Sequence, residues 1–138
     1  MTKEEKSLLI KDLCARLPYR INILTEDNDK GHIIGVDDTE NGVFVIHIIE
    51  DGDSYTCDES IENFKPYLRP MSSMTEEERE EFRMLGGVMS YSLQHNTWAI
   101  SAFSPEAYDW LNKKMFDYRG LIEKGLALEA EEGMYKTE

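Results

Sequence analysis

The chain has 138 residues, of which 41 % are hydrophobic, so it can form one globular domain with its own core and is not a disordered acidic chain. Lys and Arg number 15 against 28 Asp and Glu, which gives a formal net charge of −13. That charge repels nucleic-acid phosphates and anionic membrane surfaces, and it therefore disfavours direct binding to either.

A helix is predicted over residues 1–18. Thr2 and Glu5 form a T-x-x-E capping box, which satisfies backbone donors at the start of a helix. Leucines then repeat at four-residue spacing from Leu9, as on one apolar helix face, and Pro18 ends the pattern.

The two cysteines, Cys14 and Cys57, lie far apart and form no C-x-x-C motif. Cys14 flanks the apolar stripe of the first helix, so we expect a buried free thiol in preference to a disulfide or a metal ligand. The charged start is unlike a signal peptide, and no apolar run approaches the length of a membrane span. We expect a cytoplasmic protein.

Residues 19–70 change to the period of strands. Strands are predicted around residues 21–23, 33–36, 43–49 and 55–57, and Asn41-Gly42 is typical of a hairpin turn. One helical turn and an extended segment follow, and Pro66 and Pro70 are expected to keep that segment out of a central strand. This pattern predicts a small antiparallel SH3-like barrel or a meander, and it implies no function by itself.

Residues 71–130 are predicted to be mainly helical. Ser73 or Thr75 caps a helix with an acidic first turn, and Ser104-Pro105 begins another whose apolar face includes Trp110. Residues 88–103 between them are ambiguous and could form two strands. Residues 121–130 are apolar enough to dock on the body of the protein, and residues 131–138 are expected to form a frayed tail.

These elements predict one α+β domain over residues 1–138, with an N-terminal helix, a barrel-like β module and C-terminal helices packed on it. No catalytic constellation, cofactor-binding glycine motif or metal-ligand spacing is recognisable. The sequence Asp27-x-Asp29-x-Gly31 resembles the start of a calcium loop but lacks the later ligands. We therefore expect neither an enzyme nor a cofactor or metal site.

Acidic residues are concentrated between residues 26 and 62, where twelve acids accompany one base, Lys30. Ordinary solubility is one interpretation of this run. The other is a surface that attracts a positively charged partner. The residues predicted to contact that partner are Asp27, Asp29, Asp37, Asp38, Glu50, Asp51 and Asp53.

Five segments carry a resemblance: residues 13–18, 65–78, 109–112, 116–122 and 125–130. Together they resemble a family of small uncharacterised proteins from gut Bacteroidetes genomes, their phages and mobile elements. The resemblance implies a setting, a small accessory protein inside a bacterial cell and plausibly phage-related, and it carries no functional residues over.

The function expected from these observations is non-enzymatic binding of a basic protein surface by an acidic accessory protein. In a phage setting the partner could be a host protein that normally binds nucleic acid. The alternative is binding or sequestering of a small ligand such as a nucleotide or metabolite, in a pocket near Trp98 and Trp110. A homo-oligomer is possible.

Overall fold

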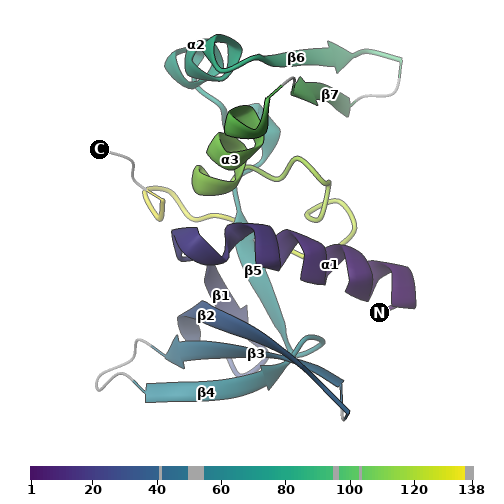
Figure 1. Ribbon diagram of the computed structural model, residues 1–138, viewed down its shortest axis with the longest axis vertical. Coiled ribbons are helices and arrows are strands. Elements are labelled where there is room, and N and C mark those ends of the chain that lie inside the picture. The colour runs from purple at the N-terminus through teal and green to yellow at the C-terminus, as the bar shows by residue number, and fades with distance from the viewer. Residues whose placement is uncertain (41, 50–54, 95–96, 103, 136–138) are drawn as a thin grey trace.

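The computed structural model describes residues 1–40, 42–49, 55–94, 97–102 and 104–135 (Figure 1). Helix α1 spans Lys3–Arg16 and begins with the predicted capping box. The Glu5 amide donates to Thr2 Oγ1 at 3.1 Å, and the Thr2 amide donates to Glu5 Oε1 at 2.8 Å. A 3₁₀ turn, η1 (Leu17–Tyr19), follows with Pro18 inside it, so the predicted end of the helix is confirmed.

The buried face of α1 differs from the predicted one. It includes Leu9 and Leu13 together with the charged residues Asp12 and Arg16. The prediction of a buried Cys14 thiol was wrong, because Cys14 is exposed. Successive helical residues are rotated by about 100°, so a face that includes Asp12, Leu13 and Arg16 turns Cys14 towards solvent. The side chain of Cys57 lies outside the described residues.

Residues 22–68 and a short C-terminal strand form an open sheet. Its strand order is β4-β3-β2-β1-β5-β8. The strands are β1 (Asn22–Thr25), β2 (Lys30–Thr39), β3 (Gly42–Ile49), β4 (Tyr55–Ser60), β5 (Phe64–Leu68) and β8 (Leu128–Glu129). All pair antiparallel to their neighbours except β8, which is parallel to β5.

The predicted meander is confirmed and the predicted barrel was wrong. Strands β1 to β4 follow one another across the sheet, and the β2–β3 hairpin closes with Thr39 opposite Gly42. Gly42 was predicted in the turn but begins β3, and its φ of 122° suits glycine. A barrel requires its two edge strands to pair with each other. Here β4 and β8 lie at opposite edges of the sheet, so it stays open.

The segment that contains Pro66 was also predicted incorrectly. It forms β5, which lies inside the sheet between β1 and β8. The sheet accommodates the proline because β8 pairs only with Tyr67 and Leu68. Pro66 has a register partner in β1, Ile23, but none in β8 among the described residues, so its missing amide interrupts no ladder on that side.

The second half of the chain contains η2 (Met71–Ser73), α2 (Glu76–Met84), the hairpin of β6 (Gly87–Ser92) and β7 (Thr97–Ala102), and α3 (Pro105–Lys113). Thr75 caps α2 with a second capping box, and Ser104 caps α3. Within the ambiguous residues 88–103 the structure has the strands β6 and β7, so the interpretation as two strands is confirmed for the described residues. Among the described residues no helix follows α3, so this half is less helical than predicted.

Two hydrophobic clusters divide the interior. One lies between α1 and the sheet and includes Leu9, Leu13, Ile23 and Phe64. The other lies among η2, α2 and α3 and includes Phe82 and Trp110. Figure 1 shows the sheet at one end of the molecule, α2 with the β6–β7 hairpin at the other, and α1 and α3 between them.

The C-terminal segment packs on the sheet side of the molecule. Leu121, Leu126 and Ala127 are buried in the cluster beside the sheet, as predicted for docking of residues 121–130. Residues 131–138 were expected to form a frayed tail. That expectation was wrong for residues 131–135, because the Tyr135 hydroxyl is hydrogen bonded to the backbone of β1 and β5. Burial of an aromatic ring and two hydrogen bonds hold this segment in place. No helix in the described part of the chain is long and apolar enough to span a membrane.

Candidate functional site

The acids predicted to contact a partner do not all lie together. Asp27 and Asp29 are in the turn between β1 and β2. Asp37 lies near the far end of β2, opposite Phe44, which places it on the order of 20 Å away along the strand. The side chain of Asp38 lies outside the described residues, as do Glu50, Asp51 and Asp53.

A groove lies beside Trp110, one of the two predicted pocket residues. Its volume is about 820 Å³, and its apolar surface comes from Met84, Leu85 and Trp110. Four carboxylates line it as well: Glu76, Glu77, Glu80 and Glu81 of α2. We call these seven residues the α2 groove. Trp98 lies in β7, but its side chain is outside the described residues.

Trp110 is held in a stack of three rings. Its ring centroid lies 5.6 Å from that of Phe82 and 5.7 Å from that of Phe116, with both pairs nearly parallel. Gly87 allows Phe82 this position, because a Cβ atom at residue 87 would clash with the Phe82 ring. Trp110 is thus fixed by packing while 9 % of it remains exposed to the groove.

The acids of the α2 groove follow from the helix register. Glu76, Glu80 and Met84 recur at four-residue spacing and so share one side of α2, while Glu77 and Glu81 share the adjacent side. Glu81 Oε2 accepts a hydrogen bond from Trp110 Nε1 at 2.9 Å. Met84 is 73 % exposed, so the groove has an apolar wall open to solvent.

The carboxylates of α2 differ in how their charge is compensated. Arg69 donates to both oxygens of Glu78, at 2.7 Å each, and these hydrogen bonds hold the pKa of Glu78 below its usual value despite partial burial. Arg83 bonds to Glu80 in the same way and lowers its pKa. Glu76 and Glu77 are exposed, and neither forms an ion pair within the described residues.

A second groove, of about 590 Å³, adjoins the first. Glu77, Glu78 and Glu81 form its α2 side, and Glu131 and Glu132 of the C-terminal segment form the opposite side. Its cations are Arg69, which Glu78 binds, and Lys114, which lies one helical turn beyond Trp110. We call it the tail groove, because residues 130–133 and Tyr135 line it.

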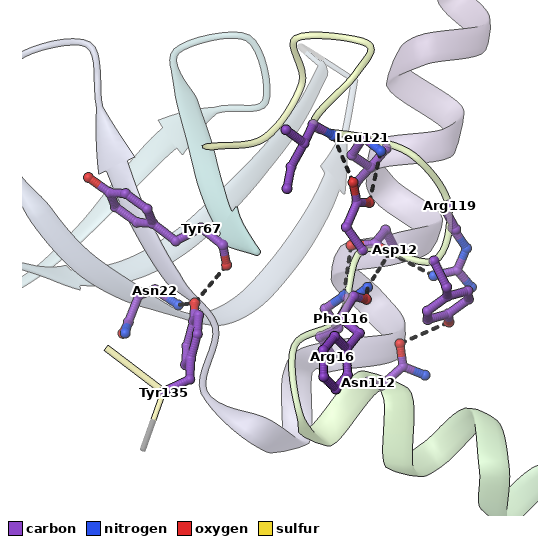
Figure 2. Close-up of polar contacts among 12 residues, drawn as sticks. Asp12, Arg16, Asn22, Tyr67, Asn112, Phe116, Arg119, Leu121 and Tyr135 are labelled. Carbon is purple, nitrogen blue, oxygen red and sulfur yellow. Dashed lines mark hydrogen bonds and ion pairs between the residues drawn. The ribbon is translucent and has the colours of Figure 1, made fainter. Parts of the chain in front are cut away.

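A buried polar junction joins the two halves of the molecule (Figure 2). Asp12 accepts two hydrogen bonds from Arg16, at 2.9 and 3.0 Å, and one from Arg119 at 2.8 Å. Arg16 also donates to the Phe116 carbonyl oxygen at 2.6 Å. The side chains of Asp12 and Arg16 are completely buried, so they are not open to a ligand, and this junction is structural.

Asp117 organises the turn beside that junction. Its carboxylate accepts hydrogen bonds from the amides of Leu121 and Ile122, at 2.8 and 2.9 Å. Burial raises the pKa of Asp117, and the two amide bonds oppose that effect. Both oxygens are therefore used by the backbone, so the geometry does not indicate an acid–base catalyst.

Comparison of the chain with protein-family models, with curated proteins and with solved structures gives no match in any of the three. The function of the grooves must therefore be argued from their chemistry.

Sequence reasoning identified Trp110 but not the acids that surround it. The glutamates of α2 were interpreted only as complementing the helix dipole. A signal was present, because Glu76, Glu80 and Met84 place an exposed methionine in line with two acids. Nothing in the sequence indicated that Trp110 of α3 would lie against that face.

Proposed function

We propose that this protein is a non-enzymatic binding protein that engages a basic protein partner through the α2 groove. One observation carries the proposal: Met84 is exposed, the half-buried Leu85 and the exposed part of Trp110 extend its apolar surface, and the charged residues that line this surface are all glutamates. Exposed apolar surface rimmed by charge is typical of protein interaction sites. A partner of matching chemistry has an apolar anchor among Lys or Arg residues.

The carboxylates of the α2 groove also support a basic partner. Glu76 and Glu77 form no ion pair within the described part of the chain, and Glu81 accepts a hydrogen bond from the neutral indole N–H of Trp110. These three carboxylates therefore project negative potential into the groove. The net charge of −13 adds a long-range field that draws a basic partner to the molecule and repels nucleic acid.

The test measures binding of a labelled synthetic peptide that carries Lys and Leu at helical spacing. Its counterpart has Glu at each Lys position. We expect the Lys peptide to bind, with an affinity that falls as salt rises, and the Glu peptide not to bind. Fluorescence anisotropy titration gives both affinities. The proposal fails if the Lys peptide does not bind.

Two matched variants locate the site. Glu76→Gln/Glu77→Gln removes two charges from the α2 groove, and Glu26→Gln/Asp27→Asn removes two from the β1–β2 turn. Because an exposed charge pair contributes about 0.2–1 kcal/mol, the loss of two charges should weaken binding about two- to thirtyfold in the first variant, and the second variant should not weaken it. Equal weakening would assign the attraction to overall charge and overturn the proposed site. A protein captured from bacterial lysate supports the proposal only if Glu76→Gln/Glu77→Gln weakens its binding and Glu26→Gln/Asp27→Asn does not.

A further inference from the structure

The α2 groove and the tail groove adjoin each other. Glu77 and Glu81, one turn apart on α2, line both grooves. The two grooves are also close at Trp110 and Lys114. Trp110 lines the α2 groove, Lys114 lines the tail groove, and the Lys114 Nζ atom lies 6.0 Å from the centre of the Trp110 ring.

The two grooves differ in the polarity of the residues that line them. The α2 groove exposes mainly apolar surface from Met84, Leu85 and Trp110. The tail groove is lined by five carboxylates and two cations. Glu78 engages one of those cations, Arg69, so the uncompensated charge there is negative. The α2 groove suits an apolar side chain and the tail groove suits basic side chains.

The outer wall of the tail groove is held in place. The Tyr135 hydroxyl accepts a hydrogen bond from the Asn22 amide at 2.9 Å and donates to the Tyr67 carbonyl oxygen at 2.8 Å (Figure 2). The Ala130 amide donates to the Leu68 carbonyl oxygen at 2.8 Å. Glu132, between these anchors, is exposed and forms no ion pair among the described residues.

We infer that the partner segment is bipartite: an apolar anchor occupies the α2 groove, and a cluster of Lys or Arg residues next to it crosses Glu77 and Glu81 into the tail groove. The inference rests on the proposed function and adds the arrangement of the partner. Because the Lys114 Nζ atom in the tail groove lies 6.0 Å from the centre of the Trp110 ring in the α2 groove, the anchor and the basic cluster must be separated by about two residues in an extended segment or by about three to four in a helix.

The test uses two peptides of one composition, each with a Leu-Leu anchor, three Lys and neutral polar residues. In the near peptide two residues separate the anchor from the lysines, and in the far peptide about eight residues separate them, a gap of about 26 Å if extended. We expect the near peptide to bind about tenfold more tightly. Equal affinities would overturn the bipartite arrangement.

Charge reversal locates the basic cluster. Glu132→Lys changes the tail groove, and Glu123→Lys makes the same change at an exposed residue that lines neither groove. We expect Glu132→Lys to weaken the binding of the near peptide about three- to tenfold more than Glu123→Lys does.

The outcomes separate the inference from the proposed function. If both reversals act equally while Glu76→Gln/Glu77→Gln still weakens binding, the α2 groove is the site and the bipartite arrangement is wrong. If no Lys peptide binds to the wild-type chain, the proposed function and the inference both fail.

Discussion

Asp12 holds a charge away from water between two arginines. Its side chain is completely buried, and it accepts hydrogen bonds from Arg16 and from Arg119. Taking charges out of water is unfavourable, so such a group is stable only where its partners are complete. Arg16 Nη1 has no hydrogen-bond partner in the described structure, which makes Asp12 the main compensation for that buried guanidinium.

We therefore expect Asp12→Asn to lower the free energy of unfolding by about 3–5 kcal/mol, because it removes the carboxylate that is hydrogen bonded to the buried Arg16 guanidinium. Urea unfolding measures the loss. Asp109→Asn, at an exposed residue of α3, is the control and should change stability by no more than about 0.5 kcal/mol. A loss below about 1 kcal/mol for Asp12→Asn would show that the junction contributes little to stability.

At the scale of elements, the C-terminal segment depends on Tyr135. Its hydroxyl bridges the backbone of β1 and the Tyr67 carbonyl of β5, and burial raises its pKa. Tyr135→Phe leaves the Asn22 amide and the Tyr67 carbonyl without these bonds. We expect the free energy of unfolding to fall by about 1–3 kcal/mol at neutral pH in urea titrations. Tyr108→Phe, at an exposed residue, is the matched control.

The effect of pH follows from the raised pKa of Tyr135. An unfolded chain ionises tyrosine at about pH 10, whereas the folded chain retains the proton to higher pH. Since the folded state then binds more protons, this contribution to stability is full below about pH 10 and is lost as pH rises above it. The difference between wild type and Tyr135→Phe should therefore shrink in alkaline solution. A constant difference would contradict this linkage.

The elements that the sequence predicted best are those whose signals are local. The capping box at Thr2, the cap at Ser104 and the hairpin at Gly42 each depend on residues a few positions apart. Helical periodicity indicates that a face is buried but not what covers it. The same pattern therefore placed Cys14 on the buried face, where the structure has Asp12 and Arg16 instead.

Long-range pairing was beyond local signals. The return of β5 to β1, the parallel pairing of β8 and the open edge at β4 depend on contacts between distant residues. The candidate site also depends on distant residues, because Trp110 and Glu81 are 29 residues apart and Glu132 is a further 22 residues beyond Trp110. Composition could predict an acidic surface, but not the position of the acids in the fold.

At the scale of the whole molecule, the two hydrophobic clusters are joined by polar contacts. Arg69 connects them through its own backbone and side chain: its amide donates to the Met115 carbonyl oxygen, and its guanidinium lies 4.1 Å from the centre of the Phe116 ring. Arg16 and Arg119 make the second connection through Asp12. Cations thus compensate acids inside this junction, and the excess negative charge remains on the surface.

That excess predicts how the fold responds to salt. A net charge of −13 on a chain of this size repels itself in the compact state, and added salt screens the repulsion. Screening also weakens exposed ion pairs such as Lys30–Glu131 and Arg83–Glu80, but each contributes little. The repulsion should therefore dominate, and the melting temperature should rise by about 2–5 °C between about 20 mM and about 500 mM NaCl. Differential scanning calorimetry measures the shift, KCl at equal ionic strength controls for ion-specific effects, and a fall in melting temperature would show that the ion pairs outweigh the repulsion.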